Sequence, residues 1–396
     1  MNFKSLIFGL IIAGFSISAF AQKAEVISAK DNLTKYLQMA RSTPKLAAPF
    51  MKSAKESIDR AILHDKTKAD PELWGMRALL YSEMAYNDST SASVNYITEA
   101  QTSLAKAKEL DADADNKENI KKAKLTLYQV QLLKGKKFFD SKNYADAYTE
   151  FNKGLEFLPG DTISNYYAGV SAQNSKNYKA AIKSYTDLLS TNFTYLPDVY
   201  TNLAESYAAN KDTAAAIKVL TEGYNKFPQS NQLVSREIEL SINSGRNKEV
   251  ISKIEAQMQK EPANKDYPFY LGIAYNAIND AAKAEEAYKK AIAIDPKFVN
   301  AYINLGTVIM NNGIEKYNAA NKKFGNKNLV AAQVTEYNKA KAQATAEFDK
   351  ALPFLLKATE IDPQSKIAWT NLRAYYNAKS NKQKVAEIDA KLSTLK

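Results

Sequence analysis

Proline and glycine recur at a fixed interval along this chain of 396 residues. Two series share a spacing of 34 residues: Pro228, Pro262 and Pro296 in one, and the pairs Gly135/Gly169 and Gly272/Gly306 in the other. A fixed period of this length is the signature of repeat architectures, in which each unit buries its apolar face only by packing on its neighbours. The spacing therefore predicts one long stack of repeats rather than separate globular domains.

The segment 265–298 shows what one repeat contains. Its small residues are Gly272, Ala284 and Ala291, and its large ones are Leu271, Tyr275 and Tyr288. Small side chains let two helices approach closely, and large ones fill the spaces opposite them. Pro296 ends the second helix, because proline cannot continue the hydrogen-bond ladder. This pattern resembles the tetratricopeptide (TPR) repeat family, which implies an all-α fold, an α-solenoid or superhelix of helix-turn-helix repeats.

The resemblance divides the chain into three parts. These are a signal peptide at 1–21, an N-terminal helical region with degenerate TPR-like repeats at 22–127, and a TPR array at 128–396. Within the array, repeats are expected near 128–161, 162–195, 197–230, 231–264, 265–298 and 299–365, followed by a capping unit at 366–396.

One repeat, at 299–365, is interrupted. Its closing proline is displaced to Pro363, and the extra residues, about 311–344, keep a helical spacing of apolar positions. We expect both helices of this repeat to grow longer and to meet in a projecting helical hairpin, with the turn at Gly325-Asn326.

The N-terminus carries the features of a secretory signal. An apolar stretch from Leu6 to Phe20 is too short to span a bilayer, and Ala19-Phe20-Ala21 fits the small-x-small pattern that signal peptidase accepts. We expect cleavage before Gln22 and an exported, periplasmic protein of a Gram-negative-type bacterium; an uncleaved anchor is the alternative. No later segment is long and apolar enough to cross a membrane.

The formal charge is +11, with 54 basic and 43 acidic residues. A basic balance often indicates nucleic acid, but export argues against that partner, and the lysines are scattered along helical segments. Two interpretations stay open: a solvated lysine-rich surface, or attraction to an anionic envelope surface or to acidic proteins.

Catalytic and metal chemistry find little support. There is no cysteine and one histidine, His64, which excludes disulfides, thiolate chemistry and a His-rich zinc site. Asp111, Asp113 and Asp115 imitate the start of a calcium loop, but Asn116 and Lys122 occupy the positions that need glycine and glutamate. We therefore expect no enzyme, no cofactor and no metal site.

Partner binding is expected where the resemblance implies it, on first-helix side chains that line the concave face of TPR superhelices. The transferred positions are Tyr166, Tyr167, Asn202, Arg236, Phe269, Tyr270, Asn276, Asn304, Asn371 and Asn377. Asn202, Asn304 and Asn371 share one repeat position, which in some TPR proteins is an asparagine ladder that grips a peptide backbone. The other interpretation is that asparagine is simply common there. The carboxylate clamp of chaperone-binding TPRs is not matched, since only Arg236 is basic.

The resulting hypothesis is an exported scaffold for protein–protein interaction, which binds an extended segment of a cell-envelope protein in its concave groove. The alternative is a carbohydrate- or peptidoglycan-binding envelope protein that uses some of its 24 tyrosines as stacking platforms.

Overall fold

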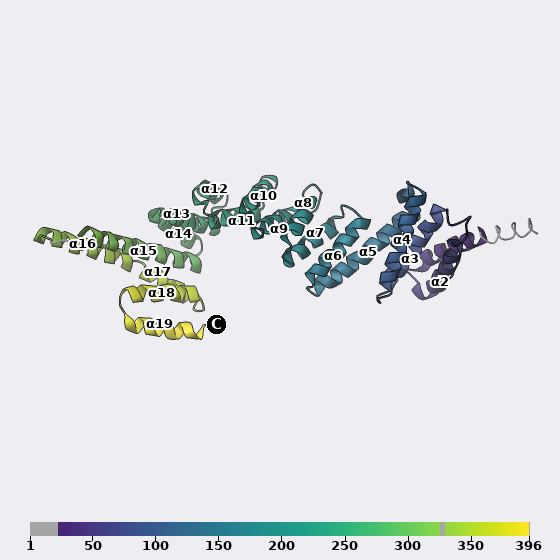
Figure 1. Cartoon of the computed structure of the whole chain (residues 1–396). Coiled ribbons are helices and arrows are strands. Elements are labelled where there is room, and N and C mark those ends of the chain that lie inside the picture. Colours follow the sequence, from purple (N-terminus) through teal and green to yellow (C-terminus); the bar gives the residue numbers. More distant parts are fainter. Residues whose placement is uncertain (1–22, 325–328, 396) are drawn as a thin grey trace, which may run out of the picture. The chain divides into compact units, whose positions relative to one another are not determined.

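The computed structural model describes residues 23–324 and 329–395, which form helices and connecting turns with no strand among them (Figure 1). A helix covering residues 23–39 is followed by α2 Pro44–Ala61, α3 Pro71–Asn87, α4 Ser93–Leu110, the short 3-10 helix η1 Ala114–Asn116, α5 Glu118–Asp140, α6 Tyr144–Phe157, α7 Thr162–Asn174, α8 Tyr178–Leu188, α9 Leu196–Ala209, α10 Thr213–Lys226, α11 Asn231–Asn243, α12 Asn247–Lys260, α13 Asp266–Ala277, α14 Ala281–Ile294, α15 Val299–Phe324, α16 Ala331–Asp349, α17 Leu352–Ile361, α18 Lys366–Ala378 and α19 Lys382–Thr394. The predicted signal peptide and the predicted Gly325-Asn326 turn lie outside the described residues.

The helices pack as successive pairs, among them α5 with α6, α7 with α8, and α13 with α14. A short turn joins the two helices of a pair, and one residue of that turn has a positive φ. These residues are Lys142, Lys176, Lys211, Gly245, Asn279 and Ser380. The predicted all-α solenoid of helix pairs is confirmed.

The spacing of the glycines follows from contacts between first and second helices. A Cβ atom on Gly272 would lie 2.5 Å from the ring of Tyr288, and one on Gly169 would lie 2.6 Å from the ring of Tyr185. Real Cβ atoms do not approach so closely, so the ring can lie on the helix only where the side chain is missing. These helix pairs are thus closed by a large residue seated on a glycine, as is the pair α5 and α6 with Gly135 and Phe151.

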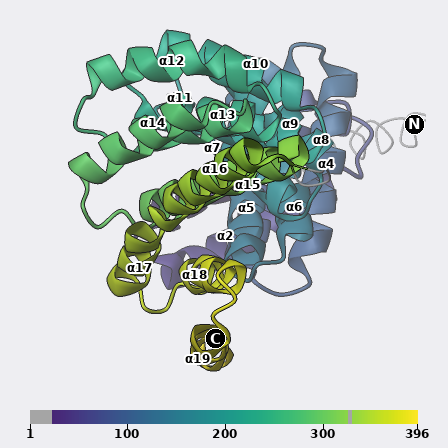
Figure 2. The ribbon, with the colours of Figure 1, turned by 90° about the vertical axis from the view of Figure 1, so that its left-hand side faces the viewer.

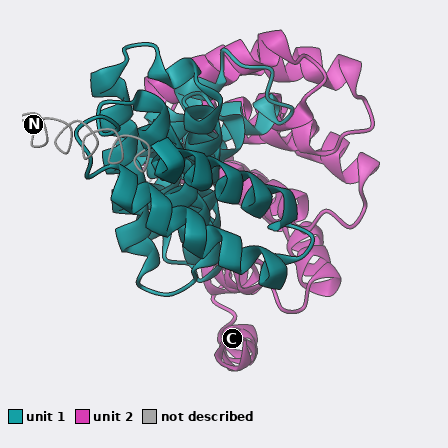
Figure 3. Ribbon diagram, turned by 90° about the vertical axis from the view of Figure 1, so that its right-hand side faces the viewer, with its two compact units in different colours: residues 1–212 teal, residues 213–396 magenta. Residues whose placement is uncertain are grey.

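The chain forms two compact units, Met1–Asp212 and Thr213–Lys396 (Figure 3). The border that the sequence suggested at 127/128 lies inside α5, which is one continuous helix of 23 residues. Its buried residues Ile120, Ala123 and Leu127 precede that border, and α5 packs against both α3 and α6.

The predicted helical hairpin is confirmed. Helices α15 and α16 lie side by side in both Figure 1 and Figure 2, and Gly313 of α15 approaches the backbone of Phe348 on α16 so closely that a Cβ would lie 2.6 Å away. The expectation of one long returning helix was wrong, because α16 ends at Asp349 and α17 begins at Leu352. Pro353 explains the break, since it lacks an N–H and crowds the carbonyl four residues earlier.

Candidate functional site

The residues that the sequence suggested for partner binding all lie on first helices of the pairs. In unit Met1–Asp212 they are Tyr166 and Tyr167 on α7 and Asn202 on α9. In unit Thr213–Lys396 they are Arg236 on α11, Phe269, Tyr270 and Asn276 on α13, Asn304 on α15, and Asn371 and Asn377 on α18.

Tyr166 and Tyr167 belong to a continuous row of aromatic rings in unit Met1–Asp212, here called the aromatic strip. Its members are Tyr144, Phe139, Tyr167, Tyr166, Phe193 and Tyr195. Neighbouring ring centroids along the strip lie 5.3 to 5.8 Å apart. These distances are typical of edge-to-face and tilted aromatic contacts, which hold the rings in place.

The strip is partly open to solvent. Tyr195 is 58% exposed and Tyr167 is 39% exposed, whereas Tyr166 and Phe193 are half-buried between them. A ring held by its neighbours and open on one side can bind an apolar side chain at a small entropic cost, and tyrosine adds a hydroxyl at its edge.

Sequence reasoning missed four members of the strip, namely Phe139, Tyr144, Phe193 and Tyr195. Phe193 and Tyr195 lie in the connection between α8 and α9, where the other repeats have a closing proline. The absence of that proline, together with two aromatic residues in its place, was the signal available.

Asn202 contacts two tyrosine hydroxyls of the preceding repeat. Burial raises the pKa of Tyr166, and the Asn202 amide offsets part of that rise by hydrogen bonding. The same amide acts on Tyr185, whose pKa is also raised by burial. Asn304 has the same relation to Tyr288 in the other unit.

The asparagine position therefore follows the chemistry of the second helix before it. Where that helix carries Phe151, which has no hydroxyl, the corresponding first-helix residue is Tyr167, and its ring stacks on that of Phe151 with 5.6 Å between the ring centroids. Asn371 follows Leu355, which offers it no hydroxyl, and it is half-buried. Asn202 and Asn304 thus stabilise the repeat packing, and Asn371 differs from them.

In unit Thr213–Lys396, Arg236 and Tyr270 meet at one carboxylate. The Arg236 guanidinium lies 3.0 Å from Glu239 Oε2, and the Tyr270 hydroxyl donates to Glu239 Oε1 at 2.6 Å. Burial, and then Glu239, raise the pKa of Tyr270. The positive charge of Arg236 is therefore balanced within the protein.

Phe269 extends this cluster, with its ring centroid 6.1 Å from Tyr270 and 4.9 Å from Phe298. Asn276 and Asn377 are exposed on the last turns of α13 and α18. The structure therefore brings Tyr166, Tyr167 and Asn202 together in one unit, and Arg236, Phe269 and Tyr270 in the other.

The described residues contain neither a candidate metal site nor a candidate membrane span. No group of three or more His, Asp or Glu side chains there is placed to hold a metal ion. Among the helices that the structure describes, none combines the length and apolar composition needed to cross a bilayer.

Comparison with known proteins supports the repeat assignment. Residues 272–313 match the TPR repeat family. No curated protein sequence matches the chain.

Solved structures of TPR proteins are similar in part. The C-terminal part of a TPR repeat-containing protein from Cytophaga hutchinsonii is 16% identical, covering 66% of this chain and 93% of that one, with a TM-score of 0.45. A TPR repeats protein from Bacteroides fragilis is 22% identical, covering 63% and 98%, with a TM-score of 0.33. YrrB, described as a TPR protein with an unusual peptide-binding site, is 19% identical, covering 50% and 95%, with a TM-score of 0.37. The TPR fold is that of a scaffold for protein–protein interaction, and TPR proteins are generally not enzymes.

Proposed function

We propose that this TPR protein is an exported scaffold that holds an extended segment of another cell-envelope protein against first-helix side chains. The observation that carries the proposal is the aromatic strip, in which Tyr167 and Tyr195 are exposed while their neighbours are half-buried. Large apolar rings are usually covered in a protein without partners, and tyrosines are enriched among the residues that dominate binding energy.

An extended peptide fits this arrangement. The strip connects α5, α7 and the loop before α9, so successive side chains of a strand-like segment can reach successive rings. Tyrosine hydroxyls at the ring edges can donate to peptide carbonyls. Such binding depends little on sequence and little on salt, since the strip carries no charge.

The asparagines have a smaller part in this proposal than the sequence suggested. The amides of Asn202 and Asn304 already act on tyrosine hydroxyls, so a peptide must share them. Each shared hydrogen bond is worth about 0.5–1.5 kcal/mol at most. The aromatic rings therefore supply most of the affinity, and the amides orient the peptide.

The cellular setting rests on residues 1–21, which lie outside the described residues. Their apolar stretch and the Ala19-Phe20-Ala21 site support export and a periplasmic location. Mass spectrometry of the protein isolated from its own cells should show an N-terminus at Gln22. An intact Met1 in the folded protein would contradict export.

Site-specific crosslinking tests the binding surface. A photoreactive phenylalanine analogue is placed at Tyr167, at Tyr195, or at Leu63, an exposed apolar control in the same unit. We expect a protein crosslink at the two strip positions and none at Leu63. The crosslinked segment is then made as a synthetic peptide, and the Tyr167→Ala, Tyr195→Ala variant should bind it at least about tenfold more weakly.

Two outcomes would overturn the proposal. One is a crosslink to a glycan instead of a protein, which would favour the carbohydrate-binding alternative. The other is equal affinity of wild type and the double variant for the synthetic peptide, while circular dichroism shows that both are folded.

A further inference from the structure

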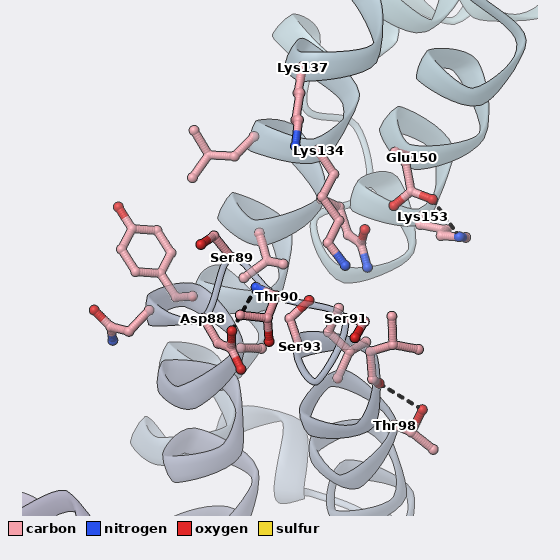
Figure 4. A pocket seen from close by; sticks show the side chains of 18 of the residues that line it. Asp88, Ser89, Thr90, Ser91, Ser93, Thr98, Lys134, Lys137, Glu150 and Lys153 are labelled. Carbon is pink, nitrogen blue, oxygen red and sulfur yellow. Dashed lines mark hydrogen bonds and ion pairs between the residues drawn. The ribbon is translucent and has the colours of Figure 1, made fainter. Parts of the chain in front are cut away.

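A cleft of about 940 Å³ lies within unit Met1–Asp212, between the loop 88–92, the start of α4, and helices α5 and α6 (Figure 4). The polar loop that separates α3 from α4 forms one wall. Helix α4 packs extensively on α3 and only slightly on α5, so the surface of α5 next to this loop stays uncovered. The cleft is separate from the aromatic strip, whose members do not line it.

Apolar side chains form the floor and the rims of the cleft. Ile97 and Val130 are buried in its floor, while Val94 is 57% and Leu133 is 53% exposed at its rims. A surface of this kind loses water favourably when a partner's apolar side chain covers it.

Two polar groups in the cleft lack partners within the described part of the chain. Gln131 is 2% exposed, yet its Oε1 atom accepts no hydrogen bond. Lys134, one turn further along α5, is half-buried and forms no ion pair. A buried acceptor left without a donor costs about 1–3 kcal/mol, so such a group requires an explanation.

The lysines of the cleft differ in how their charge is balanced. Lys153 lies 2.6 Å from Glu150 and is neutralised by it. Lys134 extends toward Ser91 of the loop and Ser93 at the start of α4 (Figure 4), and burial lowers its pKa although Glu150 counteracts this. The cleft therefore presents a partly desolvated cation beside an unused hydrogen-bond acceptor.

We propose that this cleft is a second docking site, which binds an acidic, amphipathic peptide segment of a partner protein. An apolar side chain of that segment covers Val130 and Leu133, and a carboxylate pairs with Lys134. A backbone N–H of the segment donates to Gln131 Oε1. One short peptide thus satisfies the apolar surface, the cation and the orphaned acceptor together.

The exposed rims favour a peptide over a small molecule or a lipid. Small-molecule sites bury roughly 70–90% of their ligand. Val94 and Leu133 would instead remain half open around a ligand confined to the cleft. A fatty acid also has no N–H to offer to Gln131. A peptide that continues beyond the cleft covers both rims and supplies the donor.

The test uses the full chain and a labelled, end-capped peptide of about ten residues in which leucines and glutamates alternate, as a defined probe of the proposed chemistry. Fluorescence anisotropy measures its affinity for wild type, Lys134→Glu, and Lys136→Glu. Lys136 is the matched control, because it lies on the same helix, is exposed, and does not line the cleft. We expect Lys134→Glu to weaken binding by about tenfold or more and Lys136→Glu by less than about twofold.

Further measurements make the proposal falsifiable. Replacing the glutamates of the probe by glutamine should abolish the difference between wild type and Lys134→Glu, and Lys134→Gln serves if the glutamate variant does not fold. The proposal is wrong if both lysine variants lose affinity equally, if the glutamine probe binds as tightly as the glutamate probe, or if decanoate binds wild type while the peptide does not. Tyr167→Ala, Tyr195→Ala should leave probe binding unchanged; a matching loss there would show that the two sites are one.

Discussion

The repeat formed by α13 and α14 and the region around α5 both seat an aromatic ring on a glycine. They differ in whether the polar side chains nearby have hydrogen-bond or ion-pair partners. In the first, Gly272 leaves room for the Tyr288 ring, and Asn304 of the next helix meets the Tyr288 hydroxyl. These three groups therefore each have a counterpart. The same repeat also contains a buried hydroxyl that forms no hydrogen bond within the described residues, that of Tyr267 on α13, but Tyr267 is completely enclosed in the core.

Around α5, the apolar contact between ring and glycine is also present, but two nearby polar side chains have no partner among the described residues. Gly135 accommodates the Phe151 ring as Gly272 accommodates Tyr288. One turn before Gly135, however, Gln131 Oε1 is buried without a donor, and Lys134 has no ion pair within the described chain. The comparison indicates that binding chemistry lies where groups unpaired in the described part of the chain line an open cleft, as Gln131 and Lys134 do, and not where an unpaired group is enclosed in the core, as Tyr267 is.

The largest expected effect concerns the buried hydroxyls. Burial raises the pKa of Tyr128 to about 12, and it raises the pKa values of Tyr185 and Tyr288 further. The pKa of a tyrosine side chain in the unfolded protein is about 10. The stabilisation is therefore complete below a pH of about 10 and is lost as the pH rises through about 12. We expect helix content to collapse cooperatively in that interval, together with the appearance of tyrosinate absorbance. Ionisation of every tyrosine with full helix content would contradict this.

The next prediction compares two glycines under one substitution. Gly272→Ala places a Cβ 2.5 Å from the Tyr288 ring and should cost about 2–3 kcal/mol. Gly75→Ala meets Ile120 at an ordinary 3.4 Å and should instead stabilise its helix by about 0.5–1 kcal/mol. Urea unfolding followed by circular dichroism measures both. Equal effects of the two variants would show that the ring does not sit on the glycine.

The third prediction concerns Gln131, whose replacement should stabilise the protein and weaken peptide binding in the cleft. Gln131→Met removes a buried acceptor without a donor and should raise the unfolding free energy by about 1–2 kcal/mol. The same variant should bind the leucine–glutamate peptide more weakly than wild type does. The control is Gln257, 4% exposed, whose Nε2 donates to the Tyr224 hydroxyl at 2.8 Å. Gln257→Met should lower the unfolding free energy by about 1 kcal/mol. A loss of stability in both variants would mean that Gln131 is satisfied after all.

Much of this architecture could be predicted, because close helix packing leaves a periodic mark. Gly272 and Tyr288 are 16 residues apart in one repeat, and the same relation recurs at Gly169 and Tyr185, so spacing alone indicated the contact. The break between α16 and α17 did not follow from the helical spacing of apolar residues, which continues across it; Pro353 at the start of α17 is the sequence signal for it.

The candidate sites were harder to predict, because they depend on exposure rather than on spacing. Phe193 and Tyr195 have no place in the repeat pattern, and only the structure connects them to Tyr166. Whether Gln131 is satisfied depends on whether a neighbouring side chain reaches it. This depends on the side-chain geometry between neighbouring helices, which cannot be read from a single sequence.

The smallest expected effect is a difference in unfolding free energy among variants of the asparagines that share one repeat position. If Asn304 serves the Tyr288 hydroxyl, the variants Asn304→Ala and Tyr288→Phe should each cost about 0.5–1.5 kcal/mol, and the double variant should cost less than their sum. Asn371 follows Leu355, which has no hydroxyl, so Asn371→Ala should change the unfolding free energy by less than about 0.5 kcal/mol. Denaturation midpoints of the four variants decide the matter. Additive costs at Asn304 and Tyr288 would show that Asn304 has no packing role, and all three asparagines would again be candidates for a ladder that binds a peptide backbone. With coupling at Asn304 and no effect at Asn371, only Asn371 keeps an amide free for a partner.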